Sequence, residues 1–80
     1  MEFEFSGVTL LKSESKAYEI NGKKGVSNKA YVLVGSDVFK CKVNDSLYAE
    51  IKDVVKEDGN AKFYLSTYNG VPSLALLAFS

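Results

Sequence analysis

The 80-residue chain contains no histidine, no tryptophan and no arginine, and it has only one cysteine and one proline. A single cysteine cannot form an internal disulfide. Without histidine or a second cysteine, the chain also lacks the residues for a zinc site, a Cys–His nucleophile or a Ser–His–Asp triad. We therefore expect a protein that is not an enzyme and that holds neither a metal nor a cofactor.

The sequence also lacks an export signal and a long apolar stretch. Residues 1–7 carry two acids where a signal peptide has basic residues, and no segment approaches the roughly 20 apolar residues of a membrane span. These absences predict a cytoplasmic protein with no membrane partner. Cys41 is then expected to be a reduced thiol, and its place between Phe39 and Val43 favours a small core residue over a reactive one.

The remaining composition is that of an ordinary globular domain, with 46% hydrophobic and 25% charged residues. We expect residues 1–80 to form a single domain. A chain of this length buries only about 60–65% of the surface that its unfolded form exposes, so its margin of stability is small. Association with a partner or with a second copy is therefore expected.

The charges are balanced in number but unevenly distributed. The ten cations, all lysines, face ten acids, yet residues 11–42 hold seven lysines and only three acids, a net charge of +4. The seven lysines are Lys12, Lys16, Lys23, Lys24, Lys29, Lys40 and Lys42. A neutral total argues against strong non-specific binding of polyanions, but a local basic strip is sufficient for modest binding.

Apolar and polar residues alternate over most of the chain, which predicts strands. The alternation slips at Gly7, which indicates a bend in the first strand, and residues 15–20 either extend that strand or form a short partner to it. The predicted strands cover residues 2–10, 29–35, 37–43, 61–68 and 72–79, separated by turns rich in Asn, Asp and Gly.

The period changes to that of a helix between residues 45 and 56. The apolar positions there follow the spacing of an amphipathic stripe, and they are Leu47, Tyr48, Ile51, Val54 and Val55. Asn44 or Asp45 is available as the N-cap, and Gly59 is expected to end the helix.

The order β-β-β-α-β-β predicts a mainly β fold. It is the element order of the OB-fold, a five-stranded Greek-key barrel with one short helix between strands three and four. An SH3-like barrel is the main alternative, but it normally has no helix at that point.

Lysines and tyrosines are interleaved along the predicted strands. Tyr18 follows Lys16, and Tyr31 follows Lys29. This pattern suits a single-stranded nucleic acid, because each base stacked on an aromatic ring contributes about 1–3 kcal/mol while ammonium groups neutralise phosphates. A half-exposed β-surface also favours tyrosine for packing alone, so both interpretations stay open.

Two other features allow the same pair of interpretations. Tyr64 and Tyr68 point away from the core in the strand 61–68. The polar segment 23–29 fits either a mobile loop that grips phosphates or a solvated hairpin tip.

Two stretches resemble the single-stranded DNA-binding proteins of filamentous phages, which are small dimeric OB-fold proteins. Gly25-Val26-Ser27 followed by Lys29-Ala30-Tyr31 is similar to the family's basic-Gly-Val-Ser loop and its Lys-Pro-Tyr strand entry. The segment from Phe63 to Leu74 is similar to the family's Leu-Ser-Ser-Phe strand, tight loop and Ser-Leu return. Together with the element order, the resemblance spans most of the chain.

The resemblance implies roles for individual residues. Tyr31 and Tyr68 would stack bases, and Lys23 or Lys24 would take the place of a phosphate-binding arginine. Lys29 matches a lysine of the family, and Lys40 or Lys42 matches its third-strand basic residue. The chain departs from the family in having no arginine, a shorter 68–73 loop and no basic residue in its last strand.

The function that we expect is sequence-tolerant binding of single-stranded DNA, or of RNA, by a protein of a phage, plasmid or other mobile element. The alternative is a small β-barrel that docks a peptide on an open strand edge and binds no nucleic acid. The candidate nucleic-acid-binding residues are Lys16, Tyr18, Lys23, Lys24, Lys29, Tyr31, Lys40, Lys42, Tyr64 and Tyr68.

A symmetric homodimer is predicted on the last strand. Alternation places Leu74, Leu76 and Ala78 on one face and Ala75, Leu77 and Phe79 on the other, so both faces need cover. A second copy would cover one of them, unless the helix and the closure of the barrel cover both. The candidate interface residues are Leu74, Leu76, Leu77 and Phe79.

Overall fold

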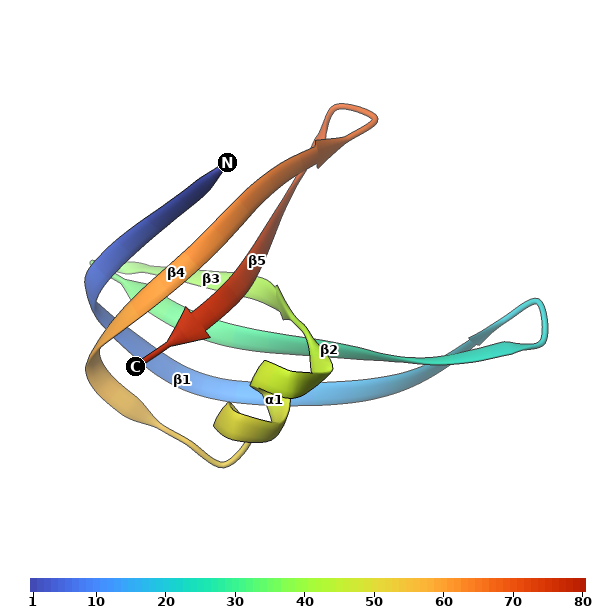
Figure 1. Ribbon diagram of the computed structural model, residues 1–80, viewed down its shortest axis with the longest axis horizontal. Helices are drawn as coiled ribbons and strands as arrows, with labels where there is room; N and C mark the ends of the chain where they lie inside the picture. Colours follow the sequence, from blue (N-terminus) through green and yellow to red (C-terminus); the bar gives the residue numbers. More distant parts are fainter.

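A computed structural model describes residues 1–80 as a closed five-stranded barrel with strand order β1-β2-β3-β5-β4. The elements are β1 (Glu2–Ile20), β2 (Lys23–Val34), β3 (Asp37–Val43), α1 (Asp45–Ile51), β4 (Lys56–Tyr68) and β5 (Val71–Phe79). Figure 1 shows α1 beneath the barrel and two hairpins projecting from it. The mainly β, OB-like barrel with one short helix between the third and fourth strands is thereby confirmed.

The long first strand closes the barrel by pairing on both sides. Its N-terminal part pairs with β4 and its remainder with β2, so residues 15–20 extend the strand rather than form a separate one. The pairing with β4 shifts register between Phe5 and Val8, where the bend at Gly7 was predicted. Beyond the bend, Val8 and Leu10 are completely buried.

The segment 23–29 is part of a strand, and the prediction of a mobile loop there is wrong. Residues 23–29 pair with β1 along their whole length, from Ile20–Lys23 to Glu14–Lys29. Asn21 and Gly22 both have positive φ angles, as a two-residue type I′ hairpin turn requires, so the turn ends before Lys23. The result is a two-stranded ribbon that projects from the barrel (Figure 1).

The helix begins where predicted but is shorter. Asn44 is its N-cap, because the Asn44 Oδ1 accepts a hydrogen bond of 2.8 Å from the backbone N–H of Leu47. The helix ends at Ile51 instead of Lys56, which leaves Val55 74% exposed. No helix of the protein is long and apolar enough to cross a membrane.

Gly59 does not end the helix, because it lies within β4 and is buried there. A Cβ at this position would collide with the ring of Phe79, so the glycine lets this ring lie directly against β4. The neighbouring Asn60 exchanges two backbone hydrogen bonds with Ser80, of 2.8 and 2.9 Å. Residues 52–55 form a turn and a short link instead of the last turns of the predicted helix, and pairing with β1 and then with the C-terminus starts at Lys56.

The core contains one aromatic side chain and small aliphatic ones. Phe63 and Leu10 are its largest fully buried side chains, while Leu47 and Ile51 of α1 close one end of the barrel. The one buried polar residue is Asn28, whose Nδ2 donates a hydrogen bond of 2.6 Å to Oδ1 of Asp45 at the start of the helix.

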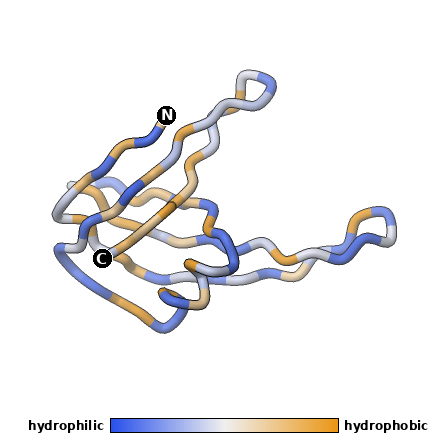
Figure 2. The backbone as a smooth tube through the Cα atoms, in the orientation of Figure 1, coloured by the Kyte–Doolittle hydropathy of each residue, from blue (hydrophilic) through white to orange (hydrophobic).

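The last strand does not alternate as predicted, because it contains a bulge at Leu77. Phe63 pairs with Leu76 and Ala61 pairs with Phe79, so three residue steps on β5 match two on β4. Phe79 consequently packs against the core, on the same side as Leu76. Figure 2 shows the C-terminal half of β5 as largely hydrophobic.

The bulge changes the candidate dimer interface. Leu76 is 1% exposed and belongs to the core of its own chain, so it is not available to a partner. Leu74 and Phe79 also pack against the core, but both keep partly exposed surface, as does Leu77. The dimer itself stays a prediction.

Cys41 is expected to be inert in the folded protein. The side chain is 1% exposed, and burial raises the pKa of its thiol to about 11. Since only the thiolate is nucleophilic, a disulfide reagent at pH 8 should label the native chain slowly and the urea-unfolded chain at once. Rapid labelling of the native chain would contradict the burial of Cys41.

Candidate nucleic-acid interface

The pairing register gathers lysines and tyrosines on the outer face of β1, β2 and β3. Tyr31 on β2 lies between Lys12 on β1 and Lys40 on β3, and these three residues form one row across the sheet. Directly paired residues project on the same side of a sheet, so the row is continuous. We call this surface the basic face and define it by Lys12, Glu14, Lys16, Tyr18, Lys29, Tyr31, Lys40 and Lys42.

Tyr31 is the centre of the basic face. The Lys12 Nζ lies 4.7 Å and the Lys40 Nζ 5.7 Å from the centroid of its ring. The Tyr31 hydroxyl donates a hydrogen bond of 2.9 Å to Oε1 of Glu14. These contacts fix the orientation of the ring and hold two ammonium groups beside it.

The lysines of the basic face are crowded. Lys29 pairs with Lys42 on β3 and lies beside Lys40, and the positive charge of Lys40 is the main cause that lowers the pKa of Lys29. Glu14, which pairs with Lys29 on β1, partly offsets this effect. Five lysines and one carboxylate on this face leave unneutralised positive charge, which an anionic ligand would balance.

Lys16 and Tyr18 extend the basic face onto the projecting ribbon. Tyr18 pairs with Gly25, and its ring lies so close to this residue that a side chain at position 25 would collide with it. The Tyr18 side chain remains 48% exposed. Lys23, at the far end of the ribbon, falls on the same face by strand alternation.

Three of the predicted residues lie elsewhere. Lys24 falls on the opposite face of the ribbon, because strand neighbours alternate. Tyr64 pairs with Glu2 and Ala75 on the outer face of β4, with β5 between it and β3. Tyr68 lies at the tip of the β4–β5 hairpin and is 79% exposed.

The structure also adds two residues that were not among the candidates, Lys12 and Glu14. A shift in the β1–β2 register between Leu10 and Lys12 leaves Leu11 as an extra residue. Simple alternation from the buried Leu10 would direct Lys12 inward, but the bulge turns it outward. The only sequence signal was the pair of consecutive leucines, which is too weak to locate a bulge.

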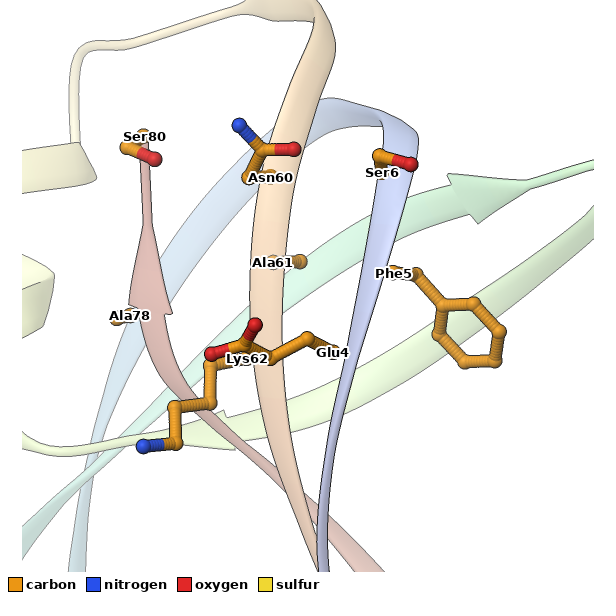
Figure 3. A pocket seen from close by; sticks show the side chains of 8 residues that line it. All are labelled: Glu4, Phe5, Ser6, Asn60, Ala61, Lys62, Ala78 and Ser80. Carbon is orange, nitrogen blue, oxygen red and sulfur yellow. The ribbon is translucent and has the colours of Figure 1, made fainter.

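A separate hollow of about 500 Å³ is lined by residues 4–6 of β1, residues 60–62 of β4 and the C-terminal end of the chain (Figure 3). Figure 3 shows Phe5 turned away from Lys62, on the far side of Glu4. The lining of this hollow combines Glu4 and Lys62 with small polar residues. The hollow shares no residue with the basic face. The opposite charges make this hollow a poor site for a polyanion.

Comparison of the chain with protein-family models, curated proteins and solved structures gives no match.

Proposed function

We propose that the protein binds single-stranded DNA on the basic face, without catalysis and with little dependence on sequence. The observation that carries this proposal is the row of Lys12, Tyr31 and Lys40 across three neighbouring strands. It places an aromatic ring between two ammonium groups, as a stacked base and its flanking phosphates require. The face of strands two and three is also the surface on which OB-folds bind oligonucleotides.

The resemblance to filamentous-phage proteins supports the same proposal. Gly25-Val26-Ser27 and Lys29-Ala30-Tyr31, which carry part of that resemblance, follow one another along β2. In this proposal Lys29, Lys40 and Lys42 contact phosphates, and Tyr31 stacks a base. We extend it to a cytoplasmic protein of a phage, plasmid or mobile element that coats single-stranded DNA, with RNA as a competing ligand.

Peptide docking on an open strand edge is the rival function. Because the chain has no tryptophan, its fluorescence comes from tyrosine. Stacking of bases on Tyr31 and Tyr18 should quench this fluorescence when oligo(dT) is added, whereas a protein that only docks peptides should show no change.

Lysine and tyrosine variants separate the contribution of charge from that of stacking. Binding of oligo(dT) through three to five phosphate contacts should give a slope of log affinity against log salt of roughly −2 to −3.5. The double variant Lys29→Ala and Lys42→Ala should flatten this slope by about 1.4, because about 0.7 is lost with each contact.

Tyr31→Ala should weaken binding of oligo(dT) by about 1–3 kcal/mol with the salt slope nearly unchanged, and Tyr31→Phe should restore most of the loss.

The matched control replaces Lys52, the C-cap of the helix, and Lys62, which lines the separate hollow that shares no residue with the basic face. Their double alanine variant should bind oligo(dT) with the wild-type slope. Equal slopes for both double variants would remove Lys29 and Lys42 from the site, and normal binding by folded Tyr31→Ala would remove Tyr31.

We also propose that the chain forms a homodimer. A folded chain of 8.8 kDa exposes about 4,800 Å² according to the relation between area and mass. This chain exposes 5638 Å². The excess is close to the roughly 800 Å² that each partner buries in a standard interface. Exposed apolar residues such as Val71, 64% exposed on β5, contribute to this area.

Sedimentation equilibrium at micromolar concentration should give twice the chain mass of 8.8 kDa. Leu77→Glu should return the protein to a monomer if the bulge on β5 lies in the interface, because a carboxylate there would be buried without a partner. A wild-type protein that sediments as a single 8.8 kDa species would disprove the dimer.

A further inference from the structure

The barrel is closed between β3 and β5 by a short stretch of strand pairing. These strands are parallel and pair at two positions, Lys42 with Ala75 and Val43 with Leu76. Toward their N-terminal ends the strands diverge, as Figure 1 shows, because β5 follows the projecting β4–β5 hairpin. A seam therefore opens between Phe39 on β3 and Pro72 on β5.

An aromatic pocket of about 540 Å³ lies at this seam. Phe3, Phe5 and Phe63 form its floor, with the rings of Phe3 and Phe63 stacked at a centroid distance of 5.6 Å. Phe39 lines it from β3, and Phe5 and Phe39 remain 47% and 41% exposed. Phenylalanine at such exposure on an inward-facing position is unusual, because nothing in the chain covers it.

The pocket is continuous with the basic face. Lys29 and Lys40 line a hollow on that face together with Lys16 and Tyr18. The same two lysines line a second hollow that crosses the seam to Leu74. Lys40 and Leu74 in turn line the aromatic pocket. The three hollows are thus neighbours, running from Tyr18, past Lys40 on β3, to the phenylalanines.

We propose that the aromatic pocket takes up one nucleobase of the strand bound on the basic face, and that it prefers thymine. This inference rests on the proposed binding of single-stranded DNA. A strand that follows the lysines reaches the edge of β3 at Lys40, where the phosphate can stay with the ammonium group while its base turns into the pocket. There the base stacks against the exposed ring of Phe39.

The preference for thymine follows from the side chains of the lining. Seven of its nine residues are hydrophobic, Lys40 is the one charged group, and no side chain offers a hydrogen-bond acceptor. The exocyclic amino group of cytosine would lose its water there without a side-chain partner, which is unfavourable. Thymine has one N–H donor, at N3, instead of the two N–H bonds of the cytosine amino group, its carbonyl oxygens can accept from Lys40, and its methyl group adds an apolar contact.

The test measures the affinities of the folded protein for fluorescently labelled oligo(dT) and oligo(dC), each of about 16 nucleotides, the upper end of the site size of an OB-fold. Wild type should bind oligo(dT) several-fold more tightly. Phe39→Ala should lower the affinity for oligo(dT) roughly tenfold and abolish the difference between the two oligonucleotides, with the salt slope unchanged. Circular dichroism establishes that the variant is folded, which is expected because Phe39 lies outside the core.

Val38→Ala is the matched control. Val38 is the neighbour of Phe39 on β3, is 57% exposed and does not line the pocket. This variant should keep both the affinity and the preference for oligo(dT).

The remaining outcomes separate the pocket from the proposed function. Wild-type preference and affinity in folded Phe39→Ala would overturn the pocket while leaving binding on the basic face intact. Absence of DNA binding by wild type would overturn both. If Phe39→Ala binds both oligonucleotides normally but sediments as a monomer where wild type is a dimer, the pocket holds a second copy of the chain and the nucleobase site is wrong.

Discussion

The register of β2 between β1 and β3 is the constraint on which the basic face depends. Ala30 and Val32 on β2 are completely buried, while Lys29 and Tyr31 alternate with them on the outer side. A slip of one residue would bury Lys29 and expose Ala30, so burial of the core fixes the register. The same register then places Lys40 beside Tyr31, because β3 pairs with β2 without a bulge.

The same register also brings like charges together, which lowers the stability of the folded protein when no ligand is bound. Lys29 and Lys40 are diagonal neighbours across the β2–β3 ladder, and the positive charge of Lys40 lowers the pKa of Lys29. The strands cannot separate these lysines without giving up their pairing. In the proposed function, a ligand that supplies negative charge along the row would relieve this repulsion, even though the net charge of the chain is zero.

Much of the architecture could be predicted from the sequence, because strand alternation and the Asn44 cap are local signals. The end of the helix could not, since Val54 and Val55 keep helical spacing while the partners of residues 56–60 lie in β1 and at the C-terminus. The direction of Lys12 depends on a bulge that alternation does not reveal. Most candidate lysines lie on one face, but the aromatic pocket is assembled from all five strands and has no local signature.

A single strand of DNA bound on the basic face, as we propose, would lie against the amides of β1, β2 and β3. The most direct measurement is a titration of the ¹⁵N-labelled protein with oligo(dT), followed by amide NMR shifts. We expect the largest changes at Lys29, Tyr31 and Lys40, with the amide shifts of α1 nearly unchanged. Changes centred on α1, or no changes at saturating oligonucleotide, would contradict the proposed binding.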